Sequence, residues 1–144
     1  MIKFILTEDV LPLRNSVLRE GKFLLKDCIF ENDDHPKTFH LGYYQDDELV
    51  CVASFHPQKH ANFEGEAFQL RGMAVLSGNQ KQGFGSLLIK EAEKIALEQN
   101  IKIIWFNARE IAVDFYKRIN YVILGTRFEI EGVGPHFIMY KKLN

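Results

Sequence analysis

The sequence is poor in cysteine, and its two cysteines show no pattern of a ligand set or a cross-link. Cys28 and Cys51 stand apart with no CxxC pair, which excludes a zinc ribbon and a disulfide scaffold. His56 and His60 have helical spacing, but Pro57 lies between them and no HExxH pattern accompanies them. We therefore expect no metal, two reduced thiols and a cytoplasmic location.

Long apolar runs and an excess of charge of either sign are also missing. No segment approaches the about 20 apolar residues of a membrane-spanning helix. The apolar stretch that opens the chain, MIKFIL, is too short for the core of a signal peptide. A formal net charge of −1 favours neither nucleic acid nor an anionic membrane. We expect no partner of either kind.

Length and apolar periodicity predict one domain, residues 1–144, of mixed helix and strand content. The order of elements predicts an α/β protein of the α+β type, with a mixed, mostly antiparallel sheet and helices on both faces. Its centre holds one strand–loop–helix–strand crossover. Strands are expected over 2–6, 39–44, 48–55, 67–76, 102–106, 121–128 and 136–142, and helices over 7–19, 84–95 and 109–119.

Two glycines, Gly83 and Gly85, stand where the second helix should begin. A helix N-terminus offers unpaired N–H groups and a positive dipole end, so glycines there let an anion approach the backbone closely. The alternative is an ordinary helix entry. A P-loop is absent, and a dinucleotide-binding GxGxxG would need glycine at Leu88. The loop therefore predicts a phosphate or pyrophosphate cradle of another kind.

The stretch QKQGFG, residues 80–85, resembles the Q/R-x-x-G-x-G/A signature of the GNAT acetyltransferases. It follows LRGMAVL and opens an amphipathic helix, as in that family. Further on, IIWFNAREIAVDFYKRINY is similar to the family's second cofactor-side segment. Asn120 replaces the usual glycine there, and asparagine tolerates the left-handed conformation at a helix end. The chain resembles a small bacterial-type member with the acyl-CoA N-acyltransferase fold.

The resemblance implies that acetyl-CoA, as cosubstrate, lies between two strands that splay apart at a bulge near Gly72. Backbone of residues 73–75 would pair with the pantetheine arm and hold the oxyanion. Asn107 would hydrogen-bond the same arm, and Tyr116 would give a proton to the departing thiolate. The implied cofactor-binding residues are Met73, Ala74, Val75, Gln80, Lys81, Gln82, Gly83, Phe84, Gly85, Ser86, Asn107 and Tyr116.

Each of these positions also has a purely structural interpretation. Gly72 could relieve crowding in the sheet, and Ser86 could be an ordinary first-turn residue. Asn107 could cap the helix that follows it. Tyr116 could pack beside Phe115 without touching a ligand.

The sequence leaves several candidates for the general base. Many family members carry glutamate where this chain has Gln69, which cannot take a proton, although Glu64 and Glu66 lie nearby. His40 and His136 titrate in the right range. His136, in GVGPHFIM, lies near where acceptors usually bind, so His136 and Tyr116 are the candidate catalytic residues. A structural hydrogen bond is the alternative role for each histidine.

Arginines on the first helix are candidates for holding the acceptor. Arg14 and Arg19 could bind a carboxylate or phosphate of the acceptor, or could be solvated surface residues. The sequence does not identify the acceptor, the acyl length or the oligomeric state, although small relatives often form homodimers.

The predicted function is transfer of an acetyl group from acetyl-CoA to a primary amine, by direct attack through a tetrahedral intermediate. A small-molecule acceptor is favoured because no charged face suggests a protein tail. A protein N-acetyltransferase is one alternative. A non-catalytic acyl-CoA sensing module, favoured by Gln69 and disfavoured by Tyr116, is another. A nucleotide-binding protein is the third.

Overall fold

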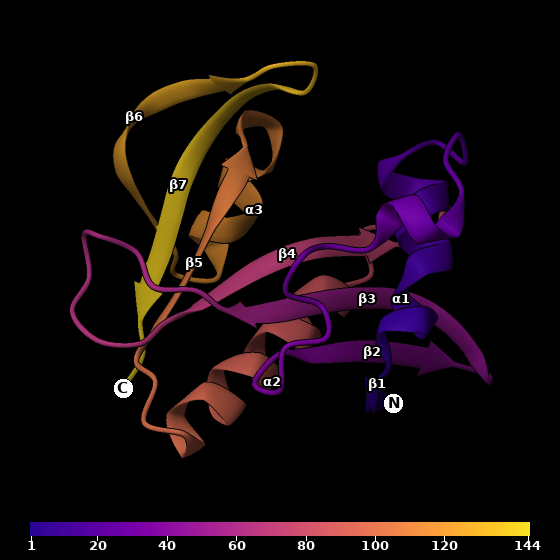
Figure 1. Ribbon diagram of the computed structural model, residues 1–144, viewed down its shortest axis with the longest axis horizontal. Coiled ribbons are helices and arrows are strands. Elements are labelled where there is room, and N and C mark those ends of the chain that lie inside the picture. The colour runs from indigo at the N-terminus through magenta and orange to yellow at the C-terminus, as the bar shows by residue number, and fades with distance from the viewer.

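The chain of the computed structural model, described over residues 1–144, alternates strands with short and long helices (Figure 1). Its elements in order are β1 (Ile2–Ile5), α1 (Thr7–Leu13), the π-helical turn η1 (Arg14–Leu18), the 3-10 turn η2 (Leu25–Cys28), β2 (Phe39–Gln45), β3 (Glu48–Pro57), β4 (Phe68–Val75), α2 (Phe84–Glu98), β5 (Ile103–Arg109), the 3-10 turn η3 (Glu110–Ala112), α3 (Val113–Arg118), β6 (Val122–Ile130) and β7 (Gly134–Lys142).

All strands join one seven-stranded sheet in the order β1-β2-β3-β4-β5-β7-β6. Every neighbouring pair is antiparallel except β4 and β5, which are parallel. Because parallel neighbours need a crossover, α2 connects them. The predicted mixed, mostly antiparallel sheet with one central crossover is confirmed.

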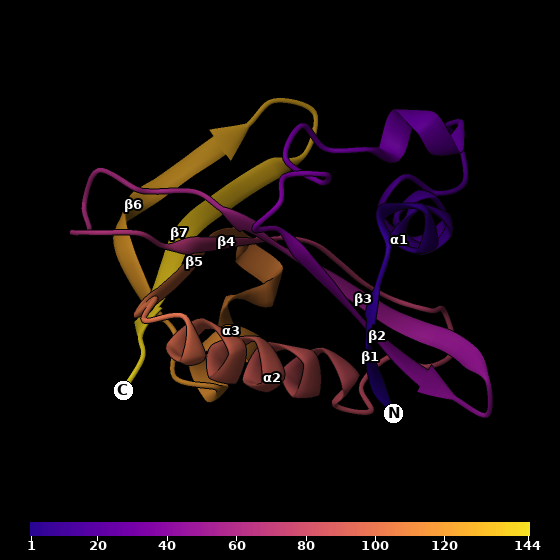
Figure 2. The same cartoon turned by 60° about the horizontal axis from the view of Figure 1, so that its bottom comes forward.

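Helices cover both faces of the sheet, as predicted (Figure 2). α2 and α3 lie on one face, where Leu88, Ile89 and Ala92 of α2 are fully buried in the main apolar core. α1 lies on the other face, where Val10 and Leu13 pack in a smaller core. None of the helices is long and apolar enough to cross a bilayer.

Two expected helices differ from the observed ones. The first is α-helical only to Leu13 and then widens into the π turn η1, directly after Pro12, whose ring removes a backbone donor. The last begins later than expected, because β5 keeps pairing with β7 up to Arg109. Ile111, in the expected helix 109–119, lies instead in η3 and is 89% exposed.

Candidate functional site

β4 and β5 pair over a short stretch and then separate. Phe68 pairs with Ile104 and Gln69 with Trp105, and no further pair follows, although β5 continues to Arg109. Figure 1 shows the two strands diverging from this point. Beyond Gln69 the β4 backbone therefore lacks a strand partner on its β5 side, where its polar groups are open to a ligand.

A β-bulge at Gly72 accompanies this separation. The register of β4 against β3 shifts between Val52 and Ser54, and Gly72 has a φ of +64°. A Cβ on Gly72 would lie 2.8 Å from Arg14 Nε and 3.0 Å from Phe30 Cε2. The predicted bulge is confirmed, and close packing together with the positive φ explains why the residue is glycine. Met73 to Val75 follow the bulge directly.

The loop before α2 presents a row of unpaired backbone amides. None of the N–H groups from Gln80 to Ser86 donates to another backbone group, and the first helix bond runs from Leu87 N–H to the Gly83 carbonyl over 3.1 Å. Lys81 and Gly83 have φ values of +64° and +83°. Alternation with left-handed residues turns successive N–H groups toward one side, as in an anion-binding nest.

The two glycines of this loop serve different purposes. A Cβ on Gly83 would meet nothing within 4 Å, so its positive φ is what requires glycine. A Cβ on Gly85 would lie 3.0 Å from Met73 Sδ, so glycine there lets α2 pack against β4. Phe84 is buried, with its ring centroid 4.6 Å from that of Tyr43. Phe84 therefore offers a ligand its backbone only, whereas Gln80, Lys81 and Gln82 are exposed.

Tyr116 in α3 is buried among aromatic rings but keeps a free hydroxyl. Its ring centroid lies 4.2 Å from that of Phe106, and burial raises the pKa of Tyr116 to about 12. The hydroxyl has no partner within the chain, and it is not among the fully enclosed polar atoms. It therefore stays protonated at neutral pH and is available as a proton donor.

Asn107 lies inside β5, opposite Ile138 of β7, and does not precede a helix. Its interpretation as a helix cap is therefore wrong, since β7 extends the strand past it. The side chain is exposed. Asn107 follows Trp105 by two residues, so its side chain lies on the same face, just past the last pair with β4.

The model of the acetyltransferase (GNAT) family matches residues 3–121 of the chain. The chain belongs to this family. It is 38% identical over 143 residues to the Bacillus subtilis protein named uncharacterized N-acetyltransferase YitI. The matched region covers 99% of this chain and 95% of YitI. The family and this relative identify the chain as an acyltransferase enzyme that uses a donor of the acetyl-CoA type.

Solved structures share the fold at low sequence identity. Escherichia coli ElaA has a TM-score of 0.75 and 21% identity, covering 99% of this chain and 100% of that one. An aminoglycoside 6'-N-acetyltransferase complexed with coenzyme A has a TM-score of 0.71 and 16% identity, covering 99% and 96%. The predicted acyl-CoA N-acyltransferase fold is confirmed.

His136, a predicted catalytic residue of this GNAT acetyltransferase, is buried in β7. Its Nδ1 lies 2.8 Å from the Gly134 carbonyl. A carbonyl only accepts, so Nδ1 carries the proton and Nε2 is the basic nitrogen. Ile138, two residues on, packs with Trp105 in a cluster separate from the main core under α2. His136 therefore shares the α1 face with Trp105 and Gln69.

No carboxylate of the predicted candidates lies at the opening of β4. Glu64 is exposed in the loop before the strand, and Glu66 pairs with Lys37 over 3.7 Å. Gln69 is half-buried at the last β4–β5 pair. His136 is thus the titratable candidate that the fold leaves on this face.

Arg14 neither faces an acceptor nor lies in solvent, so both predicted roles are wrong. Arg14 is 1% exposed. Its Nη2 donates to Asp33 Oδ1 over 2.9 Å and to Ser54 Oγ over 2.8 Å, and its Nη1 donates to the Cys28 carbonyl over 2.9 Å. The π turn η1 directs the guanidinium inward, where it neutralises a buried carboxylate. Only its Nε lacks a partner, facing Gly72.

Asp33 is the centre of this buried network, and sequence reasoning missed it. His56 Nε2 lies 2.9 Å from Asp33 Oδ1, and the Phe30 amide donates to Oδ2 over 2.7 Å. Burial alone would raise the pKa of Asp33, but the hydrogen bonds from Arg14, His56 and the Phe30 amide hold it well below its usual value. The carboxylate is therefore ionised and fully used inside the protein.

His40 belongs to the same network and has no free nitrogen for catalysis. Its Nδ1 lies 2.6 Å from Ser54 Oγ, and its Nε2 lies 3.0 Å from the Asp33 carbonyl. Burial lowers the pKa of His40, which the Asp33 carbonyl partly offsets. The structural interpretation of His40 is the one the contacts favour.

Arg71 and Phe30 are the other residues that sequence reasoning missed. Arg71 follows Gln69 by two positions in β4 and therefore shares its face. The Arg71 guanidinium lies over the Phe30 ring, 4.2 Å from its centroid. Strand alternation from Gln69 could have found Arg71, but nothing local marks Phe30, which comes from the irregular segment after η2.

Two surface hollows lie away from this site. One of about 450 Å³ is lined by Phe63, Ile103 and Leu143, and one of about 320 Å³ by Pro57, Lys59 and Glu66. Neither contains the loop amides, Tyr116 or His136. The site at the splay is therefore defined by the β4 backbone that has no β5 partner beyond Gln69, and not by an enclosed volume.

Proposed function

We propose that this enzyme transfers the acetyl group of acetyl-CoA directly to the primary amine of a small-molecule acceptor. The observation that carries the proposal is that the unpaired amides from Gln80 to Ser86 adjoin both β4 and the helix that carries the unpaired hydroxyl of Tyr116. A Cβ on Gly85 would lie 3.0 Å from Met73 Sδ and 3.8 Å from Phe115 Cζ. The same elements frame an unpaired β4 backbone. A donor needs all three: an anion cradle, backbone for its arm, and an acid.

The residues present fit the charge and shape of the donor. Its pyrophosphate would lie at the N-terminus of α2, where unpaired N–H groups and the helix dipole favour negative charge. Lys81 is exposed beside them and adds a cation. Acetyl-CoA supplies the acetyl group as a thioester whose thiolate is a fair leaving group.

The chain's own groups would then act at the reacting carbonyl. Backbone N–H groups of Met73 to Val75 would stabilise the oxyanion, an effect worth about 10²–10³ in rate for one donor in other enzymes. As the C–N bond forms and the C–S bond breaks, Tyr116 would protonate the departing sulfur. His136 Nε2 would accept the proton that the amine loses, directly or through one water.

The acceptor and the setting are part of the proposal. A small amine fits because the chain carries no strongly charged surface segment for a protein tail, with a net charge of −1. The cytoplasm fits because both cysteines are free and buried. A homodimer stays a prediction.

Ligand-dependent unfolding combined with a transfer assay tests the proposal. Acetyl-CoA at about 100 times its dissociation constant adds about 2.7 kcal/mol and should raise the melting temperature by several degrees. ATP and NAD should not. Gly83→Asn, which tolerates the positive φ, should keep the shift, and Gly83→Val should lose it. Coenzyme A release with a panel of amines should then follow.

Each alternative function has its own outcome. A shift with acetyl-CoA but no release with any amine or peptide would favour the sensing module. Release with peptides alone would identify a protein N-acetyltransferase. A shift only with ATP or NAD would refute the proposal outright.

A further inference from the structure

Arg71 projects from the acceptor face of β4 immediately before the bulge. Gln69 pairs with Trp105, and Arg71 and Asn107 each come two residues later on the two diverging strands. Both side chains therefore lie on the α1 face at the mouth of the splay. Gly72 alone separates Arg71 from Met73, whose backbone is the proposed site of the reacting carbonyl.

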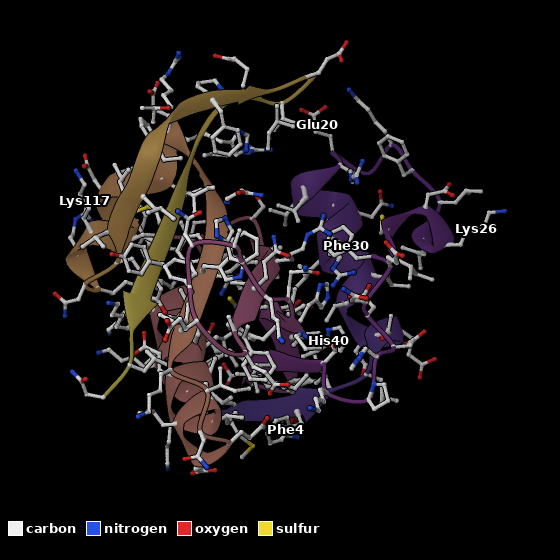
Figure 3. The ribbon with its side chains drawn as sticks, turned by 60° about the vertical axis from the view of Figure 1, so that its left-hand side comes forward. Phe4, Glu20, Lys26, Phe30, His40 and Lys117 are labelled. Carbon is white, nitrogen blue, oxygen red and sulfur yellow. The ribbon has the colours of Figure 1, made fainter.

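The Arg71 guanidinium has no anionic partner within the protein. It makes neither a hydrogen bond nor an ion pair, and its only specific contact is the face of Phe30, 4.2 Å from the ring centroid. The Arg14 guanidinium also packs on the Phe30 ring, with Arg14 Cζ 4.0 Å from the ring centroid. The Phe30 ring is held in place by its own amide, which donates to Asp33 over 2.7 Å. The backbone of Phe30, which is labelled in Figure 3, is thus tied to the buried Asp33 carboxylate.

The surroundings of Arg71 hold an excess of positive charge. Burial of its guanidinium and the like charges of Arg14 and Arg19 lower the pKa of Arg71, while Asp33 opposes them. The Asp33 carboxylate is already bound by Arg14, His56 and the Phe30 amide. Arg19, at the end of η1, is exposed and stacks on Phe23 at 5.1 Å, with no carboxylate partner.

We propose that the acceptor is an amine that also carries an oxyanion, a carboxylate or a phosphate, and that Arg71 binds this group with Arg19 beside it. The inference rests on the proposed function, because it names the acceptor class of the same site. A guanidinium offers a planar pair of donors that matches either oxyanion. Its stacking on Phe30 limits the positions that the guanidinium can take before an acceptor binds.

The position of Arg71 also constrains the size and charge of the acceptor. Arg71 and Met73 are separated only by Gly72, and two residues of even a fully extended chain span at most about 7 Å, so the oxyanion and the amine of the acceptor must be separated by few bonds. Small amino acids and phosphorylated amino alcohols meet this requirement. A polycationic amine would instead meet the charges of Arg71 and Arg19 and be repelled.

Matched acceptor pairs test the inference with the full chain and saturating acetyl-CoA. Each amino acid is compared with its carboxamide, and phosphoethanolamine with ethanolamine, while spermine serves as the polycation. Arg71→Gln and Arg71→Lys are compared with Arg118→Gln, an exposed arginine on α3. We expect the anionic member of a pair to be preferred about 10-fold or more. Arg71→Gln should raise its KM about 10- to 100-fold, as for loss of a charged hydrogen bond.

Several readouts separate a binding role from a structural one. The KM for acetyl-CoA, the kcat and the activity on neutral amines should change less than about 3-fold in Arg71→Gln, and Arg71→Lys should restore part of the lost preference. Arg118→Gln should match the wild type. The inference would be overturned if neutral and anionic amines were acetylated equally well. It would also be overturned if Arg71→Gln lost the same activity on both members of a pair. A raised KM for acetyl-CoA would also overturn it.

An equilibrium measurement distinguishes this inference from the proposed function. In the presence of coenzyme A, the anionic members should raise the melting temperature of the wild type but not of Arg71→Gln. If no amine is acetylated and this Arg71-dependent shift is present, the transfer proposal fails and the oxyanion site stands. If only neutral amines are acetylated and no anion produces a shift, the oxyanion site fails and the transfer proposal stands.

Discussion

The two sides of the β4–β5 splay are built from different chemistry. The donor side, from Gln80 to Ser86, consists of backbone amides at a helix start. The acceptor side consists of side chains, Arg71 on Phe30 with the buried Arg14–Asp33 pair behind them. In the proposed function, backbone groups would bind the pyrophosphate, whereas side chains would select the amine. The proposed donor side therefore depends on backbone geometry, and the proposed acceptor side depends on the identity of its side chains.

The largest expected effect comes from breaking the buried support of the acceptor side. Arg14→Met leaves the Asp33 carboxylate without its main cation, and removing one partner of a buried pair costs about 3–5 kcal/mol. We expect denaturant unfolding to show that loss. Arg14 Nε faces Gly72, but the backbone amides from Gln80 to Ser86 make no contact with Arg14. The acetyl-CoA-induced stabilisation should therefore remain.

The control for this prediction is Arg127→Gln, which breaks an exposed pair with Glu110 of 2.8 Å. It should cost less than about 1 kcal/mol. A loss below that value for Arg14→Met, or a parallel loss of acetyl-CoA binding, would show that the two sides are not independent.

Tyr116→Phe should have an intermediate effect, on kcat and not on the binding of either substrate. Its pKa of about 12 keeps the hydroxyl protonated throughout the assay range, so it acts as an acid. Because thiolate is a fair leaving group unaided, we expect kcat to fall about 10- to 100-fold, at or below the lower end for general acid catalysis. Both KM values should stay unchanged. Steady-state kinetics with both substrates varied measures this.

Tyr44→Phe, at a half-buried tyrosine near the end of β2, is the matched control and should behave as the wild type. An unchanged kcat in Tyr116→Phe would assign its hydroxyl a packing role. Since the raised pKa places its deprotonation near pH 12, kcat should show no alkaline decline from this group below about pH 10.

The same contrast explains what the sequence could predict. The loop QKQGFG and the crossover around it are local patterns, so the sheet, the helix start at Phe84 and the bulge at Gly72 were predicted correctly. For Gly85 the structure adds a packing reason that the sequence could not give, because contact with Met73 Sδ depends on how α2 packs on β4.

The acceptor side could not be predicted in this way, because its groups are far apart in the chain. Arg14 comes from η1, Asp33 from the segment after η2, and His56 from β3. No local spacing links them, and an arginine on a short helix is more often exposed than buried. The cap interpretation of Asn107, one of its two predicted roles, is wrong for a related reason, since only pairing with β7 shows that β5 continues.

The smallest expected effect is a pH dependence of stability that His40 imposes on the acceptor side. Burial lowers the pKa of folded His40, whereas the unfolded chain has a value near about 6.5. Above that pH both states are neutral and the contribution is constant. As pH falls through about 6.5, the unfolded chain takes up a proton that folded His40 refuses. The free energy of unfolding then decreases by at most about 1.4 kcal/mol per pH unit, until the folded pKa is reached.

Urea unfolding at pH 7.5 and 5.5 measures this decrease in the free energy of unfolding, with a substitution of an exposed histidine, His35→Gln, as control. His40→Gln should flatten the decline and His35→Gln should not. An equal decline in both variants would mean that the buried network does not exclude the proton from His40.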